Sequence, residues 1–373
     1  MIFYLTNSLI LKEEKDFFYL PTYKHCIRNI ANAAIEGSHI LRGDYEILSN
    51  CIELFKGDEE FEIFFRDLVN NYSTKTIPPE ITYYIEVVKE NPKERDENGC
   101  IIAQKNINDF YLSSSLMSCN LICEDENDCD FYEFVTKWYI EKERLNYNVR
   151  VNKIGGGGER TLCKVRKCIE DGLVCICVVD SDKKFPEMDI NRNSVKCKKL
   201  DKQLCGYRCI LLSVNEIENL LPLNYINDVF ITDKKYKWEN NQLQKKHFDY
   251  LSSCNVKIEI LKYFDYKNGI KKDSLLLSNK YYKKFAKQCC DQNPDIYNNC
   301  TFEEYLQTIP DKGCVYKKLS ETISIDVLNY INKNIANNVL KAPELLIFQE
   351  EEWIKIAKEI LNWSCARIPE GLS

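Results

Sequence analysis

The sequence contains few histidines and none of the short spacings on which several common sites depend. Only three histidines, His25, His39 and His247, occur among 373 residues, so a nucleophile activated by histidine is not expected. No Gly-x-Ser-x-Gly elbow is present, and no two cysteines are separated by two residues, the spacing typical of structural zinc sites. We therefore expect neither a Ser/His or Cys/His hydrolase nor a zinc module.

Long hydrophobic runs and a basic leader are also missing. No stretch approaches the roughly 20 apolar residues of a membrane span, and charged residues from Lys12 onward come too early for a signal peptide. The nineteen cysteines are scattered without an even framework, so we interpret them as reduced thiols, with Cys123, Cys175 and Cys177 packed inside strands. The expected location is the cytoplasm, without membrane association.

The length and the 45% apolar content suit a globular chain of two or three domains. We expect an α/β fold with a mostly parallel, toprim-type sheet and crossover helices over residues 116–225. This domain would be flanked by a mainly helical region at 1–115 and by a mainly helical, partly basic region at 226–373. Apolar side chains recur at helical spacing over 26–42 and 46–70, and an amphipathic helix at 350–363 is expected to pack in the core, with a partner groove as the alternative.

Strands and helices are expected to alternate in the central region, the order that produces a parallel sheet. The predicted strands are 116–124, 148–154, 173–179 and 207–213, and the predicted helices include 128–145 and 160–171. The run Gly155 to Gly158 forms a turn after the second strand. It lacks the Gly-Lys-Ser/Thr ending of a phosphate-binding loop, so the chain is not expected to carry an ATPase core.

Acidic residues follow two of the predicted strands. Glu124 ends the first, and Asp180 and Asp182 follow the third, where we expect both side chains to point the same way because strand side chains alternate. Since ligand sites lie at the carboxyl edge of parallel sheets, these carboxylates would face one point and attract Mg²⁺ or Mn²⁺. Each acid taken singly can instead be a solubilising or helix-capping residue, Asp128 in particular.

In this order, the segments resemble a known family, the toprim domains. Cys123-Glu-Asp-Glu-Asn-Asp128 resembles the first toprim motif, Asp180-Ser-Asp182 resembles the Asp-x-Asp motif, and the glycine turn lies between them as expected. Asn215-Glu-Ile-Glu-Asn219 is similar to a segment of the overcoming-lysogenization-defect (OLD) nucleases and of toprim phage-defence effectors. The chain departs from the pattern twice, with Asp125 in place of the usual glycine and Asn215 in place of the usual arginine.

The resemblance implies a two-metal Mg²⁺ or Mn²⁺ site and a role for each acidic residue. Glu124 would be catalytic, and the implied metal ligands are Glu124, Asp180 and Asp182, with Glu216 or Glu218 completing the second ion's shell. Asp128 would order the first loop or bind metal.

Such nucleases also use a lysine from outside the toprim core. Lys267, expected in a turn after a strand at 256–264, is our catalytic candidate, because a compact ammonium can neutralise charge that develops on phosphate. Lys271 and Lys272 are close competitors, and a plain surface lysine is the alternative interpretation.

Charge is unevenly distributed along the chain. Residues 1–100 carry 11 Lys/Arg against 18 Asp/Glu, whereas residues 233–290 carry 14 against 6. The basic segment could lie along a phosphate backbone, although a solvated helix face explains the charge equally well. The aromatic residues interleaved in it are Tyr236, Trp238, Phe248, Tyr281 and Tyr282, and the candidate nucleic-acid contacts are Arg160, Lys271, Lys272, Lys283 and Lys284.

Together these features predict a metal-dependent endonuclease, a hydrolase acting on ester bonds of DNA or of structured RNA such as tRNA. By resemblance it would serve antiviral defence together with a separate ATPase or sensor protein, and a homodimer is left open. The alternatives are a housekeeping toprim ribonuclease that matures RNA and a non-catalytic metal-binding module that works through protein contacts.

Overall fold

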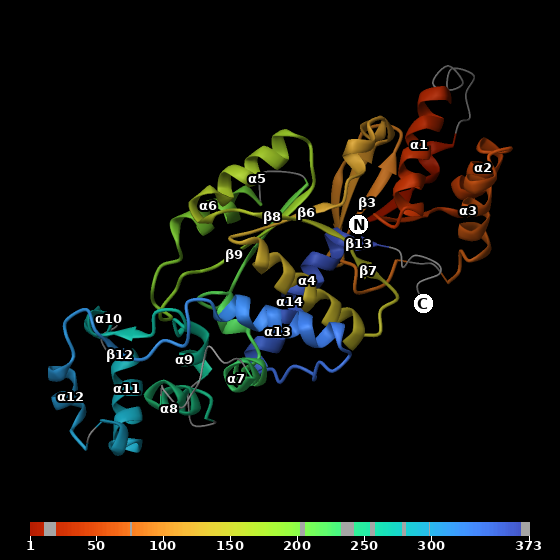
Figure 1. Cartoon of the computed structure of the whole chain (residues 1–373). Coiled ribbons are helices and arrows are strands. Elements are labelled where there is room, and N and C mark those ends of the chain that lie inside the picture. Colours follow the sequence, from red (N-terminus) through yellow and green to blue (C-terminus); the bar gives the residue numbers. More distant parts are fainter. Residues whose placement is uncertain are drawn as a thin grey trace. The chain divides into compact units, whose positions relative to one another are not determined.

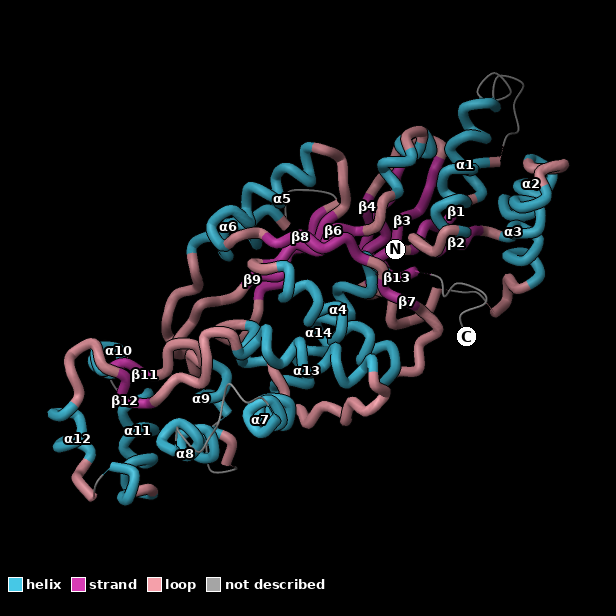
Figure 2. Tube along the Cα trace, viewed as in Figure 1, coloured by secondary structure: helices cyan, strands magenta, loops and turns pink. Residues whose placement is uncertain are grey.

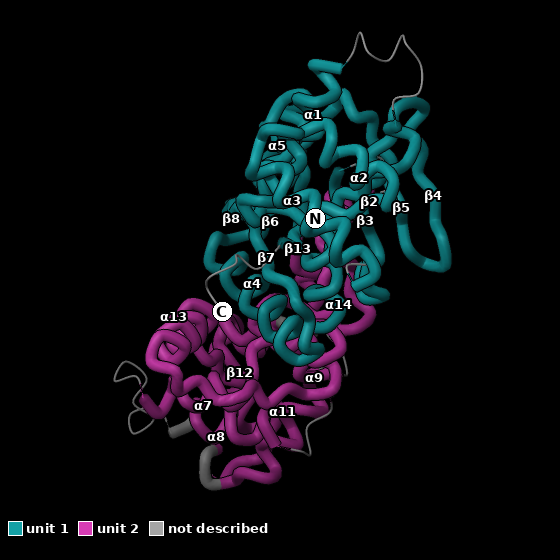
Figure 3. The backbone as a smooth tube through the Cα atoms, turned by 90° about the vertical axis from the view of Figure 1, so that its right-hand side faces the viewer, with its two compact units in different colours: residues 1–177, 200–210, 354–373 teal, residues 178–199, 211–353 magenta. Residues whose placement is uncertain are grey.

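A computed structural model describes residues 1–10, 20–74, 77–201, 206–232, 242–253, 258–277, 281–297 and 299–366. These residues form helices and mostly parallel sheets, which confirms an α/β fold (Figure 1). The chain divides into two compact units (Figure 3), the first made of residues 1–177, 200–210 and 354–373 and the second of residues 178–199 and 211–353. This division differs from the three predicted regions, because the segment 116–225 contributes to both units.

Residues 2–106 contain a five-stranded sheet, which was not expected in the region predicted to be mainly helical. Its order is β2-β1-β3-β5-β4, and all neighbours are parallel except β4 and β5. The strands are β1 (Ile2–Leu5), β2 (Ile40–Gly43), β3 (Tyr83–Val88), β4 (Glu94–Glu97) and β5 (Cys100–Asn106). The associated helices are α1 (Leu20–Ile35), α2 (Tyr45–Leu54) and α3 (Glu59–Asn70) (Figure 2).

The predicted helix over 26–42 is confirmed as far as Ile35 and ends there for a local reason. Gly37 adopts φ +70°, a conformation that glycine tolerates and that ends helices, so α1 stops at Ile35. Residues 40–43 then pair with β1. Strands of four residues are too short to show the alternation of apolar and polar positions by which strands are predicted.

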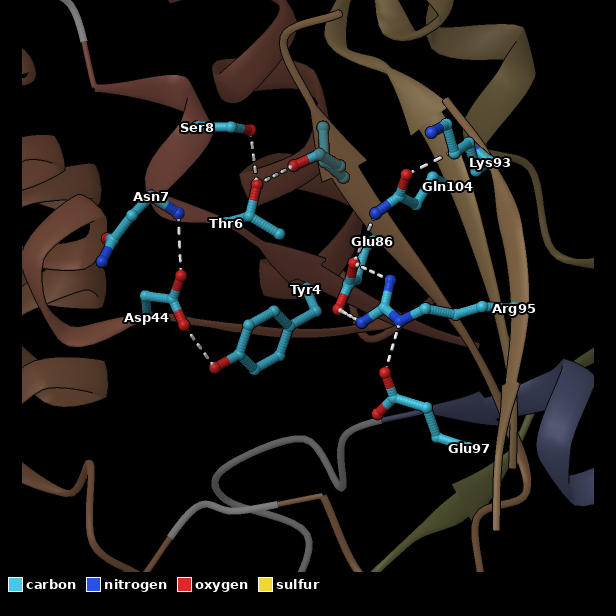
Figure 4. A network of polar contacts seen from close by, with 11 residues as sticks. Tyr4, Thr6, Asn7, Ser8, Asp44, Glu86, Lys93, Arg95, Glu97 and Gln104 are labelled. Carbon is cyan, nitrogen blue, oxygen red and sulfur yellow. Dashed lines mark hydrogen bonds and ion pairs between the residues drawn. The ribbon is translucent and has the colours of Figure 1, made fainter. Parts of the chain in front are cut away.

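Polar side chains fasten neighbouring segments of this first sheet (Figure 4). The Tyr4 hydroxyl donates to Asp44 over 2.8 Å, and Asp44 also accepts from the Asn7 backbone N–H over 2.7 Å. The guanidinium of Arg95 pairs with both oxygens of Glu86, each over 2.7 Å, so β3 and β4 are linked by a bidentate ion pair. These groups satisfy one another and hold the sheet together.

A second sheet contains the alternation that the sequence predicts. Its order is β10-β9-β6-β8, and β6 is parallel to both β8 and β9. The strands are β6 (Cys119–Cys123), β8 (Val151–Gly155), β9 (Cys175–Val179) and β10 (Tyr207–Leu211), with α4 (Glu126–Lys142) between β6 and β8 and α5 (Thr161–Glu170) between β8 and β9. The chain moves out from β6 to β8 and then back past β6 to β9, so right-handed crossovers place α4 and α5 on opposite faces (Figure 1).

Burial explains why these strands were predictable. All five residues of β6 are buried, as are Cys175 to Val178 of β9, the pattern of parallel strands covered on both faces. Cys123, Cys175 and Cys177 pack within the strands as expected, and every cysteine in the described residues is a free thiol.

The end of the chain packs in the first unit. Asn362 of α14 (Ile347–Ser364) donates to the Thr82 hydroxyl over 2.8 Å, and the Trp363 ring stacks on Tyr83 at 4.3 Å. The short strand β13 (Cys365–Ala366) pairs with β7 (Asn148–Val149). The predicted core role of the C-terminal helix is confirmed, because Trp353, Ile356, Ile360 and Trp363 are all buried.

The second unit is mainly helical, as expected for the C-terminal region. Its helices are α6 (Arg192–Leu200), α7 (Leu223–Thr232), α8 (Gln242–Leu251), α9 (Ile258–Tyr263), α10 (Lys272–Leu277), α11 (Tyr281–Gln292), α12 (Phe302–Thr308) and α13 (Ile323–Ala336). The short strands β11 (Ile270–Lys271) and β12 (Cys314–Tyr316) pair antiparallel.

The strand expected at 256–264 is instead α9 in its described part. Ile260, Leu261 and Phe264 are all buried, a helical spacing that the sequence analysis mistook for a strand. Among the described residues, no helix is long and apolar enough to cross a membrane.

Candidate functional site

The glycine turn is anchored to the end of β6. The backbone N–H of Gly156 donates to the carbonyl of Cys123 over 2.6 Å, and that of Gly157 donates to the carbonyl of Glu124 over 2.8 Å. A side chain at position 156 would meet Thr161 Oγ1 at 2.1 Å, so only glycine fits there. At Gly158 a Cβ would lie 3.4 Å from Oε1 of Glu124, which places the exposed carboxylate of Glu124 beside the turn.

Asp125 and Asp128 cap the helix that follows. The Asp125 side chain accepts from the Asn127 backbone N–H over 2.9 Å, and Asp128 accepts from the Asp125 backbone N–H over 2.8 Å, which forms a capping box at the start of α4. Asp128 therefore orders the first loop, one of the two roles that the resemblance implied. Asp125 has φ −119°, an extended conformation open to any residue, so its replacement of the family's glycine causes no backbone strain.

Asp180 and Asp182 lie in the second unit, beyond the last residue of β9. Asp182 has φ +55°, so the alternation of strand side chains does not continue through this residue. The expectation that Asp180 and Asp182 point the same way depended on that alternation and no longer holds. The Asp182 carboxylate accepts from the Asn191 amide over 2.6 Å, and its backbone N–H donates to the Asn215 carbonyl over 3.0 Å. This loop is thereby attached to the segment that carries the next two acids.

Glu216 and Glu218 share one lysine. The ammonium nitrogen of Lys267 lies 3.2 Å from Oε2 of Glu216 and 3.1 Å from Oε1 of Glu218. Glu218 is 1% exposed, whereas 34% of the Lys267 side chain is exposed. The structure thus brings together three residues that the sequence analysis had named, across about fifty positions of the chain.

The Lys267 ammonium is the main partner of these carboxylates. Apart from it, no described group directs a hydrogen bond to Oε2 of Glu216 or to either oxygen of Glu218. Asn215 is fully buried, and neither polar atom of its side chain has a hydrogen-bond partner in the described structure. Buried polar groups are normally satisfied, so this cluster calls for a ligand, water or ion.

The turn that presents Lys267 is held from two sides. The amide of Asn219 donates to the carbonyls of Leu261 and Phe264 over 2.7 and 2.9 Å, which fixes the end of α9 against the 3-10 helix at Ile217–Leu220. Gly269 has φ +68°, and a Cβ there would meet the Tyr316 carbonyl at 2.2 Å. The backbone around Lys267 therefore has little freedom.

Electrostatics in this cluster are dominated by burial. Burial raises the pKa of Glu216 to about 7, with the charges of Glu218 and Asp265 adding to the effect and Lys267 opposing it. The pKa of Lys267 is raised by the two glutamates, although its own burial acts in the opposite direction.

A second ion pair in this unit was missed by the sequence analysis. Lys184 lies 3.0 Å from Asp265, which is 5% exposed and also accepts from the Asn268 backbone N–H over 2.7 Å. No sequence pattern indicates this pair, since Lys184 follows Asp180-Ser-Asp182 in a loop without regular spacing.

In the part of the chain that is described, no group of three or more His, Cys, Asp and Glu side chains is arranged to hold a metal ion. The chemistry of Glu216 and Glu218 nevertheless fits a hard divalent cation, because both offer carboxylate oxygens and share a single compensating cation, Lys267.

The predicted nucleic-acid contacts are scattered. Arg160, Lys271, Lys283 and Lys284 are exposed, and Lys272 instead donates to the Ile309 carbonyl over 2.8 Å. Phe248 and Tyr282 are 3% and 4% exposed and cannot stack on bases, which favours the solvated-face interpretation for their helices. Tyr236 and Trp238 lie outside the described residues, as does the side chain of Tyr281.

Comparison with known proteins adds no assignment. No protein-family model, no curated protein and no solved structure matches the chain.

Proposed function

We propose that the chain is a Mg²⁺- or Mn²⁺-dependent endonuclease of toprim type that cleaves DNA or structured RNA such as tRNA. The observation that carries the proposal is the pairing of the buried Glu218 and the half-buried Glu216 with the ammonium of Lys267. Carboxylates removed from water are costly unless a cation compensates them, so this pair suits a cation-binding role.

Each residue of the cluster has a role in this proposal. Glu216 and Glu218 would hold a divalent ion, which supplies an activated water and stabilises charge on the leaving oxygen. Lys267 would neutralise charge on the phosphate. Glu124, Asp180 and Asp182 are the further proposed ligands, and this part of the proposal rests on the family resemblance.

The biological setting rests on the family resemblance. We propose antiviral defence with a separate ATPase or sensor protein as partner. The alternative is housekeeping maturation of RNA by the same chemistry. The substrate that the protein prefers distinguishes antiviral defence from RNA maturation.

Purified protein and the variant Asp180→Ala, incubated with Mg²⁺ or Mn²⁺, test the activity on plasmid, linear DNA and tRNA. Asp171→Asn serves as a control, because this exposed carboxylate only pairs with Lys167 on the same helix. We expect cleavage by the wild type and by the control, and loss of cleavage in Asp180→Ala and after chelation. Equal behaviour of wild type and Asp180→Ala on every substrate would overturn the proposal.

The second candidate is a metal-binding module without catalysis, in which the pairing of Glu216 and Glu218 around one cation serves structure alone. Thermal stabilisation by Mn²⁺ without cleavage of any of the three substrates would select this candidate.

A further inference from the structure

We propose that Lys267 is the resident cation of the Glu216–Glu218 pair, and that a divalent ion binds to this pair only by displacing the lysine side chain. This inference rests on the proposed function and concerns how its metal site is loaded. It assigns Lys267 two successive positions, one on the glutamates and one away from them.

The first position is the one in the structure. Nζ of Lys267 lies 3.2 Å from Glu216 and 3.1 Å from Glu218, which is the region where a cation shared by both carboxylates must lie. Two carboxylates and one ammonium leave a net charge of −1, whereas a divalent ion in place of the ammonium leaves none. An ammonium and a divalent ion at the same pair would repel each other, so their occupancy is exclusive.

The pair is incompletely satisfied by the lysine. Glu218 is 1% exposed, and its Oε2 has neither a hydrogen bond nor an ion pair among the described residues. Lysine offers a compact charge with three donors, whereas a metal ion coordinates several oxygens at once, so these oxygens favour the exchange.

The exchange needs no movement of the backbone. The turn around Lys267 is fixed by the Asn219 amide and by the close approach of Gly269 to the Tyr316 carbonyl. The Lys267 side chain is flexible and 34% exposed, so it can rotate outward while its Cα stays in place. Once released, the ammonium is available to bind a phosphate group, which orders the events as metal first and nucleic acid second.

Calorimetric titration of the full chain with Mn²⁺, without nucleic acid, tests this exchange. Lys267→Met removes the competing charge and should bind Mn²⁺ on the order of tenfold more tightly than the wild type. Lys267→Arg keeps the charge and adds a fork that engages both carboxylates, so it should bind Mn²⁺ more weakly. Lys167→Met removes an exposed lysine that pairs with Asp171 at the end of α5 and should bind like the wild type.

Unchanged or weaker binding of Mn²⁺ by folded Lys267→Met would overturn the inference. If Lys267→Met does not fold, Lys267→Gln decides, because an affinity equal to that of the wild type in a folded variant without the charge would exclude competition. Absence of Mn²⁺ binding in the wild type and in all variants would also overturn it. If the Mn²⁺ affinities follow the predicted order but the protein cleaves no nucleic acid, the exchange is supported and the proposed nuclease activity is contradicted.

Discussion

Nζ of Lys267 lies 3.1 Å from Oε1 of Glu218, a carboxylate that is 1% exposed and that receives no directed hydrogen bond from any described group. A lysine from the turn after α9 thus supplies the only described cation that contacts this buried acid. Breaking a buried ion pair from one side leaves an uncompensated charge, so the two residues depend on each other. The Lys267–Glu218 pair therefore matters both for the stability of the fold and for the proposed chemistry.

Glu216 should make stability depend on pH. Burial raises its pKa from 4.5 to about 7, so the folded protein holds this proton more tightly than the unfolded chain does. The free energy of unfolding should therefore fall as pH rises from about 4.5 to about 7, by at most about 3 kcal/mol. Glu216→Gln should remove this contribution, which denaturation with urea at several pH values measures. Parallel pH profiles for the two proteins would contradict the assignment.

The glycine turn offers a matched pair of substitutions. Gly156→Ala would place a Cβ 2.1 Å from Thr161 Oγ1 and 2.7 Å from the Cys123 carbonyl, so we expect a loss of about 2 to 3 kcal/mol. Gly157 has φ +72° with no atom within 4 Å of a Cβ, so Gly157→Ala should cost only about 1 kcal/mol of backbone strain. Thermal denaturation measures the loss of stability in Gly156→Ala and in Gly157→Ala. A larger loss in Gly157→Ala than in Gly156→Ala would show that the turn differs from this structure.

Asp128 should act as a cap and not as a metal ligand. Its carboxylate accepts from the Asp125 backbone N–H, so Asp128→Ala should lower the free energy of unfolding by about 1 kcal/mol. The affinity of Asp128→Ala for Mn²⁺ should match that of the wild type. A clear loss of Mn²⁺ affinity in Asp128→Ala would return this residue to the set of ligands.

Much of the second sheet could be predicted from the sequence because its strands are continuous apolar runs separated by amphipathic helices. The predicted strand at 173–179 and helix at 160–171 correspond closely to β9 and α5. The first sheet could not be predicted, since β1 and β2 have four residues each and their pairing depends on segments about forty positions apart. The division into two units was equally hidden, because it depends on contacts such as that of Trp363 with Tyr83.

The candidate site was predictable in its members but not in its geometry. Glu216, Glu218 and Lys267 were named from the resemblance, yet their contact depends on Asn219, which joins two segments through its side-chain amide. The conformation of Asp182 at φ +55° and the pairing of Lys184 with Asp265 arise from loop packing, which leaves no periodic signal in a sequence.

The most direct test of the central claim is the rate of Mn²⁺-dependent cleavage by Glu218→Gln, compared with the wild type and with Asp171→Asn. Glutamine keeps the shape of the side chain and removes the charge that Lys267 and a divalent ion would share. On whichever of plasmid, linear DNA or tRNA the wild type cleaves, we predict cleavage by the control and a loss on the order of 100-fold in Glu218→Gln. Cleavage by folded Glu218→Gln at the wild-type rate would contradict the claim.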